Sequence, residues 1–382
     1  MHLAALDAQP AVNGAGAHGN LFGPIADMML LGGGSAIAFA GLRIVDLTSS
    51  QYATLALVMW VLANIVNHPH FIHSYQLFYS LKAGIDAPDA PTTYKRMWCI
   101  AAYLVPGLLA ALLSIAIFFW AKGSNVVIAG AINLTGFLVG WHYVKQGFGM
   151  AMLYAAVKKC YWPHSVRRAL LGNAYVCWAA AWAIANNGAV GSDFWGFFQL
   201  QVSLPWWVTG LACLAAGATT LWCSVEVIST FKQWRDSGLT CGQLPVCGIF
   251  AYAVTLYLWT VFSWAIPSYL LVIPFFHSLQ YMAVVWRVKI NENKNGNESK
   301  TRLGLISFFG ATIFYASIVF WFAPGIIDYL GGGGLPWEAG GTFVAIACVT
   351  IFINIHHYFM DSVVWRKENK RLQQHLHMKS MP

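Results

Sequence analysis

Residues 341–365, which read GTFVAIACVTIFINIHHYFMDSVVW, decide the fold. This stretch is longer than the about 20 mainly apolar residues with which a helix crosses a bilayer. It also contains His356, His357 and Asp361, which are ionisable. Ionisable side chains are costly inside a membrane and are usually kept there for a function. The stretch therefore predicts a membrane-spanning helix that carries part of a functional site.

The composition of the whole chain agrees with this prediction. Of the 382 residues, 58% are hydrophobic and only 9% are charged, and the mean hydropathy is +0.58. Soluble domains have about a quarter charged residues, so a soluble enzyme is disfavoured and a disordered or fibrous protein is excluded. We predict an all-α polytopic membrane protein with about ten spans. These spans are 21–41, 53–80, 97–120, 125–157, 168–187, 204–228, 246–264, 267–287, 303–322 and 341–365.

The basic residues predict how these spans are oriented. Of the 22 Lys and Arg residues, 19 follow the even-numbered spans. The positive-inside rule then places both termini in the cytoplasm. We expect a flexible N-terminus (1–20), one transmembrane domain (21–365) and a basic tail (366–382). The positive charge is thus a sign of topology and does not indicate nucleic-acid binding. The expected location is the inner (cytoplasmic) membrane of a bacterium.

Seven of the 12 histidines fall inside the predicted spans. They are His68, His70, His73, His142, His277, His356 and His357. All lie on even-numbered spans, and His73, His277 and His357 each precede a basic residue by nine or ten positions. At 1.5 Å per residue, these three lie roughly 14–15 Å from the cytoplasmic boundary. A single histidine of this kind can be a packing residue that is hydrogen-bonded to a carbonyl group. Seven at similar depth predict a common site.

The spacing within each helix favours a metal centre. His70 and His73 share a helix face, as do His357 and Asp361. Imidazoles with a carboxylate suit iron, copper or zinc better than magnesium or calcium. The predicted ligands of one or two ions are His70, His73, His142, His277, His356, His357 and Asp361, of which Asp361 is also a candidate catalytic group. Residues expected to orient these ligands are His68, Gln76, Tyr143, Gln146, Gln280 and Tyr358.

Two pairs of short motifs suggest a duplication. Residues 71–76 and 275–280 share the pattern F-x-H-S-x-Q. His142 and His357 each begin the pattern H-Y-x-x-[QD]. The order is the same in both halves. Spans two to four would then correspond to spans eight to ten, related by an axis along the membrane normal.

A histidine-rich metal site in an apolar protein indicates a substrate dissolved in lipid. We expect non-haem iron to hydroxylate, desaturate or oxidatively cleave that substrate. In general character the arrangement resembles the polyhistidine membrane hydroxylases and desaturases, although their H-x-x-x-H and H-x-x-H-H boxes are absent and H-x-x-H occurs only from His70 to His73. Membrane carotenoid-cleaving dioxygenases are similar in having histidines within spans. Hydroxylation or desaturation would need electrons, and an acidic cytoplasmic carrier would fit the basic loops.

Two other classes of function stay open at this point. Midplane polar residues and duplicated halves are also typical of transporters, and a histidine–aspartate chain could couple transport to protons or metal ions. A membrane protein with haem between two axial histidines is the other alternative. It leaves Asp361 and the additional histidines without a role.

Overall fold

The computed structural model describes residues 19–187, 193–194, 197–198, 200, 202–293, 298–332, 343–366, 368–369 and 375–376. Most of the predicted N-terminal segment 1–20 and of the tail 366–382 lies outside these residues. The described chain is helical apart from one short hairpin of β1 (Asp193–Phe194) and β2 (Phe197–Phe198). A helical fold suits an apolar chain because each helix satisfies its own backbone hydrogen bonds without water.

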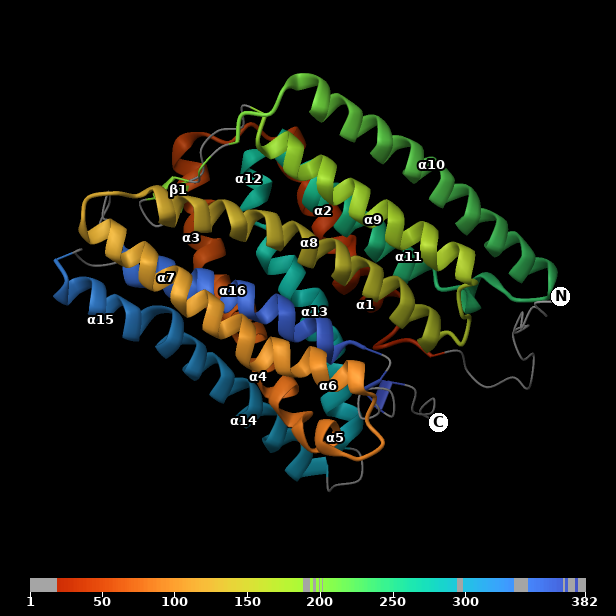
Figure 1. Cartoon of the computed structure of the whole chain (residues 1–382). Helices are drawn as coiled ribbons and strands as arrows, with labels where there is room; N and C mark the ends of the chain where they lie inside the picture. The colour runs from red at the N-terminus through yellow and green to blue at the C-terminus, as the bar shows by residue number, and fades with distance from the viewer. Residues whose placement is uncertain are drawn as a thin grey trace.

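The helices follow the chain in an order that Figure 1 shows by colour. In the first half they are α1 (Pro24–Met28), η1 (Met29–Gly33), α2 (Gly34–Ile44), α3 (Ser49–Leu62), η2 (Ala63–Asn67), α4 (His68–Ser80), α5 (Lys82–Asp86), α6 (Thr92–Cys99), η3 (Ile100–Leu104), α7 (Val105–Ala121), α8 (Val126–Val157) and α9 (His164–Ala185). In the second half they are α10 (Trp206–Asp236), η4 (Cys241–Gln243), α11 (Val246–Ala253), η5 (Val254–Val261), η6 (Ser263–Ala265), α12 (Pro267–Leu270), α13 (Ile273–Asn293), α14 (Glu298–Ser317), η7 (Ile318–Phe322), α15 (Ala323–Leu330) and α16 (Val344–Val364).

Eight helices in the described residues are long and apolar enough to cross a membrane. They are Pro24–Ile44, Ser49–Asp86, Thr92–Ala121, Val126–Val157, Trp206–Asp236, Ser268–Glu292, Ile306–Leu330 and Val344–Val364. The chain is thus a multi-pass helical protein with the character of a membrane protein. Each of the eight corresponds to one of the ten predicted spans.

The other two predicted spans, 168–187 and 246–264, are helical but are not among the eight. The first is α9, which packs between α8 and α10 (Figure 1) and is lined by polar residues such as Asn173. The second is the shorter helix Val246–Val261, formed by α11 and η5. It packs closely on α8, because a Cβ atom at Gly147 would lie 2.9 Å from Thr255 Cβ. Both are helices that other helices cover, and such helices need less apolar surface than a lipid-facing span.

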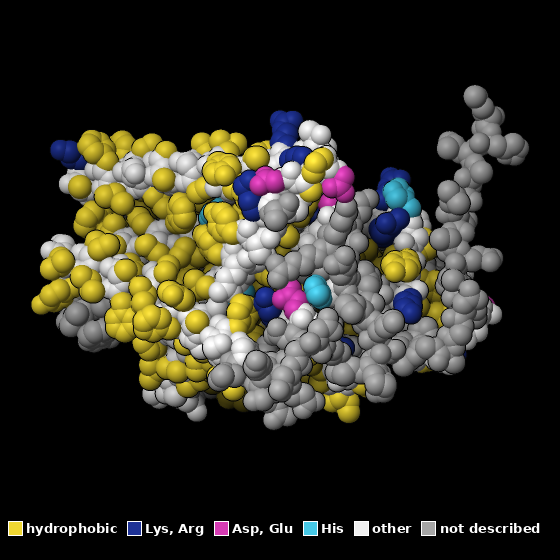
Figure 2. Space-filling model, turned by 90° about the horizontal axis from the view of Figure 1, so that it is seen from below, with side chains coloured by type: hydrophobic (Ala, Val, Ile, Leu, Met, Phe, Trp, Pro, Cys, Tyr) yellow, Lys and Arg dark blue, Asp and Glu magenta, His cyan; other side chains and the backbone are white. Residues whose placement is uncertain are grey.

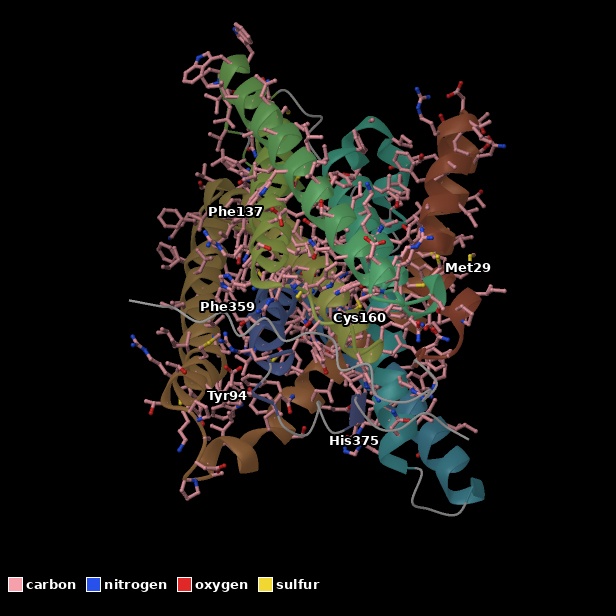
Figure 3. The ribbon with its side chains drawn as sticks, turned by 90° about the vertical axis from the view of Figure 1, so that its right-hand side faces the viewer. Met29, Tyr94, Phe137, Cys160, Phe359 and His375 are labelled. Carbon is pink, nitrogen blue, oxygen red and sulfur yellow. The ribbon has the colours of Figure 1, made fainter. Side chains whose placement is uncertain are left out.

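Two helices form the centre of the molecule. In the most apolar part of α16, 67% of the residues are buried, and in the span that contains α13 the figure is 61%, against 17% for α10. α16 contacts α4, α7 and α8. Seen from the end of the molecule, its blue ribbon lies near the middle with other helices around it (Figure 3). A side chain on the inner face of α16 is therefore shielded from lipid by other helices.

The surface is divided by residue type. Figure 2 shows hydrophobic side chains over the left part of one face and most of the charged side chains toward the right. In Figure 1 the carboxyl ends of α8 and α10 point to this same right-hand end. An apolar belt with charges gathered at one end is the distribution expected of a protein that lies in a bilayer.

Candidate metal centre

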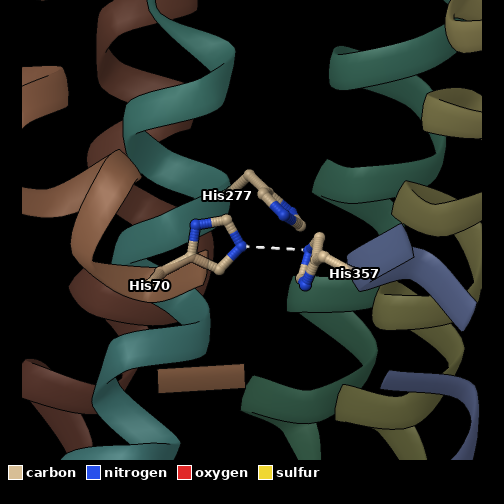
Figure 4. A group of neighbouring side chains, drawn as sticks. All are labelled: His70, His277 and His357. Carbon is tan, nitrogen blue, oxygen red and sulfur yellow. Dashed lines mark hydrogen bonds between the residues drawn. The ribbon is translucent and has the colours of Figure 1, made fainter. Parts of the chain in front are cut away.

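Four histidines and one aspartate come together between the central helices. His70 lies on α4, His142 on α8, His277 on α13, and His357 and Asp361 on α16. We call the four histidines the central histidine group. All five side chains are buried. Their donor atoms form two overlapping sets, His70–His277–His357 and His142–His357–Asp361, in each of which the atoms lie within 4.8 Å of one another. Figure 4 shows the first set.

The orientation of His70 follows from a change in the helix just before it. The helix widens to a π-helical segment at η2, and Pro69, which has no backbone N–H, stands in the first turn of α4. The Nδ1–H of His70 donates to the carbonyl oxygen of Asn67 at 2.7 Å. A carbonyl oxygen can only accept, so the proton of a neutral His70 ring is on Nδ1. The lone pair is then on Nε2.

Ser278 also holds His70. Its Oγ lies 2.9 Å from His70 Nδ1 and donates to Asn67 Oδ1 at 2.7 Å. These contacts join α4 to α13 and restrict rotation of the His70 ring. Hydrogen bonds to the non-ligating nitrogen of a histidine are typical of metal sites, where they fix both the tautomer and the direction of the ring.

His357 is held in the same way from its own side. Ser74 Oγ donates to Asp361 Oδ1 at 3.0 Å and lies 3.1 Å from His357 Nδ1. If the hydroxyl hydrogen points to Asp361 or to Tyr281, Ser74 Oγ accepts from the Nδ1–H of His357. Asp361 Oδ2 lies 3.6 Å from the same nitrogen, and Tyr281 OH lies 2.7 Å from Ser74 Oγ. In that arrangement the lone pair of His357 is on Nε2.

The two Nε2 atoms of His70 and His357 face each other at 3.2 Å, along the dashed line in Figure 4. An N–H···N hydrogen bond between the two rings accounts for this contact if one ring carries its proton on Nε2, and a positive charge between the rings accounts for it if both lone pairs are on Nε2. A shared proton is one way to supply that charge, and a metal ion is the other. Nitrogen ligands that are each 2.0–2.1 Å from one metal ion lie about 3 Å apart at ordinary coordination angles. The observed separation fits two ligands of one ion.

The other two histidines of the group have buried nitrogen atoms without a hydrogen-bond partner in the described part of the chain. These atoms are His142 Nε2 and His277 Nδ1. The nearest carboxylate oxygen to His142 Nε2 is Asp361 Oδ2 at 4.0 Å, which is beyond hydrogen-bond length. An unsatisfied buried polar group costs about 1–3 kcal/mol. Two of them beside the close contact of His70 with His357 make this a group of residues that could hold a metal ion.

The structure does not bring His356 into this group. It lies next to His357 in sequence, but adjacent residues point about 100° apart on a helix. His356 Nδ1 lies 2.7 Å from Tyr75 OH, and its Nε2–H donates to the carbonyl oxygen of Ala101 at 2.9 Å. Both ring nitrogens are therefore occupied, and His356 is placed as a packing residue.

His73 and His68 also lie outside the group. His73 Nδ1 is 3.1 Å from Gln76 Oε1, and its Nε2 is 3.4 Å from Thr312 Oγ1 on α14. Gln76, predicted to orient a ligand, therefore contacts a histidine that is not in the group. His68 Nδ1 receives the indole N–H of Trp321 at 3.3 Å. The sequence placed both residues inside the same predicted span as His70. In the structure their side chains point to α14 and η7.

The other four predicted orienting residues lie at the centre. Tyr143 packs against the ring of His277 and Tyr358 stacks on His142, each with ring centroids 4.5 Å apart. Gln146 Nε2 donates to the carbonyl oxygen of His277 at 3.1 Å and to Gln280 Oε1 at 2.8 Å. Sequence reasoning did not select Asn67, Ser74 and Ser278, which hold His70 and His357. The repeated pattern F-x-H-S-x-Q contained both serines and could have indicated them.

A cavity of about 360 Å³ adjoins the group at His142 and Asp361. It runs between α8 and α16 toward their carboxyl ends, where Trp365 and Arg366 line it. Its walls are mainly apolar, with side chains such as Phe148 and Leu153. The volume lies in the range of small-molecule sites. The histidines thus have an open side that leads into an apolar space.

Comparison with known proteins finds no matching family model, no similar curated protein and no similar solved structure.

Proposed function

We propose that the protein is a membrane-embedded oxidoreductase in which the central histidine group and Asp361 hold non-haem iron. The observation that carries this proposal is the set of convergent imidazoles, with two facing Nε2 atoms 3.2 Å apart and two further nitrogens without a hydrogen-bond partner in the described residues. A donor set of neutral imidazoles and one carboxylate suits redox-active iron. The same donors also suit copper or zinc, and metal analysis distinguishes the three.

The hydrogen bonds favour one ion over two. The two candidate sets share His357, whose Nδ1 is held by Ser74 and whose Nε2 alone is free to bind a metal. In the proposed centre His70, His277 and His357 hold the ion, and His142 supplies a fourth nitrogen. Asp361 lies on the cavity side, where its carboxylate completes the donor set and can also hold or transfer a proton. A second ion would need His357 Nδ1 to leave Ser74.

The cavity supports a lipid-soluble substrate, because its walls are apolar and it ends at His142 and Asp361. Iron bound at the group would supply activation of O₂. Hydroxylation would convert a C–H bond, O₂, two electrons and two protons to an alcohol and water. Desaturation would remove two hydrogens from adjacent carbons and yield two waters from the same co-reactants. Oxidative cleavage would insert both oxygen atoms into a C=C bond and needs no external electrons.

We further propose that both termini and the charged end of the molecule face the cytoplasm, in a bacterial inner membrane. The distribution of Lys and Arg supports this orientation. For hydroxylation or desaturation the two electrons would come from an acidic carrier that docks on the basic cytoplasmic face. The cleavage reaction would work without such a partner.

The duplication of spans two to four in spans eight to ten belongs to the same proposal. Two features support it besides the short motifs. The helices that contain η3 and η7 each pass from a π-helical segment to a Pro-Gly pair, Pro106-Gly107 and Pro324-Gly325. The serines of the two F-x-H-S-x-Q motifs also play matching parts, since Ser74 contacts His357 Nδ1 and Ser278 contacts His70 Nδ1.

A proton-coupled transporter is the second candidate, and one observation favours it. The positive charge between His70 and His357 can be a proton, and Asp361 lies within 3.6 Å of His357. The haem alternative is weaker at this pair. Axial ligands on opposite sides of an iron would be about 4 Å apart with a porphyrin between them, which the 3.2 Å contact does not allow.

Metal analysis of the purified protein tests the proposal. We expect about one iron per chain by mass spectrometry of the metals, an electron paramagnetic resonance or Mössbauer signal of non-haem iron, and no Soret band. A Soret band would contradict the non-haem site. Protein that stays metal-free after growth and purification with added iron, copper and zinc would contradict the metal centre. If such protein in vesicles carried out proton-coupled uptake, it would be a transporter.

A further inference from the structure

We propose that Lys145 binds an anionic group of the substrate, so that the substrate is a lipid-soluble molecule with a carboxylate or phosphate group. This inference rests on the proposed function, because it takes the cavity beside the central histidine group as the substrate site. The inference names the chemical class of the substrate. It also states which part of the substrate lies nearest the metal centre.

Lys145 stands where such a group would meet the site. It lines the cavity together with His142, which precedes it by three residues on α8. Residues three apart share a helix face, and the rise between them is about 4.5 Å along the axis. The backbone positions of Lys145 and His142 are therefore about one helical turn apart on the same wall of the cavity. The bonds nearest an anion on Lys145 are the ones placed beside His142 and Asp361.

The surroundings of Lys145 make a ligand anion favourable. α8 is one of the helices long and apolar enough to span a membrane, and Lys145 lies well inside it. Within the described part of the chain, no hydrogen bond or ion pair is formed by its ammonium group. A cation in a membrane span is costly and usually has a partner. A negatively charged substrate would supply the partner that the described residues do not.

The second cation on the cavity wall differs in this respect. Arg366 Nε donates to Glu368 Oε2 at 3.2 Å, so its charge is already balanced within the chain. Arg366 lies at the far end of the cavity, after the last turn of α16. The difference assigns the anion to Lys145 and leaves the apolar length of the cavity, along Phe148 and Leu153, for the hydrocarbon part of the substrate.

The test compares matched ligands in nanodiscs of neutral phospholipid. The probes are a radiolabelled long-chain carboxylic acid, the primary alcohol of the same chain length, and the corresponding monoalkyl phosphate. We expect the wild-type protein to bind the acid or the phosphate at least about ten-fold more tightly than the alcohol, since hydrogen bonds to charged groups are the strong ones. The acid and the phosphate, compared with each other, identify which anion the site prefers.

The variants then assign this preference to one residue. Lys145→Met should bind the acid and the alcohol equally, while Lys145→Arg should keep most of the preference because the charge remains. Lys232→Met is the matched control, since Lys232 is exposed on α10 and does not line the cavity. Equal binding of the acid and the alcohol by the wild-type protein would overturn the inference, and so would an unchanged preference in Lys145→Met.

Metal content separates this inference from the proposed function. Each variant is assayed before and after chelation, and Lys145→Met should keep its metal. A preference for the acid that persists in chelated wild-type protein shows that the anion does not bind the metal itself. Metal-free wild-type protein that still prefers the acid would contradict only the metal centre. Metal-loaded protein without any preference would contradict only the role of Lys145.

Discussion

Two clusters of buried polar side chains lie among the apolar helices, and they differ in how completely their hydrogen bonds are made. One is the central histidine group. The other, which we call the Asn173 cluster, joins α9, α10, α11 and η5 and consists of Asn173, Cys177, Thr219, Thr220, Tyr252 and Tyr257. Asn173 Nδ2 donates to both tyrosine hydroxyls, and its Oδ1 accepts from Thr219 and Thr220 at 3.0 and 3.1 Å. The amide of Asn173 is fully used.

The central histidine group is not closed in this way. His142 Nε2 and His277 Nδ1 have no hydrogen-bond partner among the described residues, and the Nε2 atoms of His70 and His357 face each other. A satisfied polar cluster stabilises the packing of its helices. An unsatisfied one at the end of a cavity costs stability, and a bound ion would offset that cost. The comparison therefore fits a structural role for the Asn173 cluster and supports the proposed binding role of the histidines.

Replacement of His357 by Ala should have the largest effect, because both candidate sets of donor atoms include this residue. We expect His357→Ala to lose most of its bound metal. The loss in affinity should exceed the roughly 10–100-fold that follows from changes to residues around metal ligands. Metal per chain, measured by mass spectrometry after dialysis against a weak chelator, checks the result.

The neighbouring residue is the matched control. His356→Ala removes an imidazole from the same helix turn, but that ring is bonded to Tyr75 and Ala101. This variant should keep its metal and lose thermal stability, because Tyr75 OH and the Ala101 carbonyl group each lose a partner. If His357→Ala also kept its metal, or if both variants lost it equally while remaining folded by circular dichroism, the distinction between the two histidines would be wrong.

The contrast between His356 and His357 also shows how far the sequence could predict the site. Apolar length predicted the helices well, since each of the eight candidate spans overlaps a predicted one. Depth along the helix selected seven histidines. Which four converge depends on how each helix is rotated about its axis, and this is set by packing with distant helices. His73 faces Thr312 on α14 for that reason, although His70 on the same helix faces His357.

Replacement of the two orienting serines should have a smaller effect on metal binding. Ser74 contacts His357 Nδ1 and Ser278 contacts His70 Nδ1, and neither lies among the candidate ligands. We expect Ser74→Ala and Ser278→Ala to weaken metal affinity about 10–100-fold, because the histidine rings lose their fixed tautomer and direction. Competition with a chelator of known affinity measures this change.

A buried serine away from the centre supplies the control for this prediction. Ser35 Oγ lies 2.7 Å from Tyr269 OH and accepts from Trp259 Nε1 at 2.7 Å. Ser35→Ala should lower stability without changing metal affinity. Metal affinity that is unchanged in Ser74→Ala and Ser278→Ala would show that these hydroxyl groups only fill space.

Replacement of Asn173 should have the smallest effect on the bound metal. It tests the structural role of the Asn173 cluster. Asn173→Ala leaves the hydroxyl groups of Tyr252 and Tyr257 without the amide and removes the acceptor of Thr219 and Thr220. We expect it to lower the free energy of unfolding by about 1–3 kcal/mol, seen as a lower thermal midpoint, with unchanged metal per chain. The cluster joins α9, α10, α11 and η5, none of which carries a histidine of the group, so its loss should not move the metal ligands. If instead the variant lost its metal while its thermal midpoint stayed the same, the two clusters would be coupled. Complete hydrogen bonding would then not distinguish a structural cluster from a binding site in this protein.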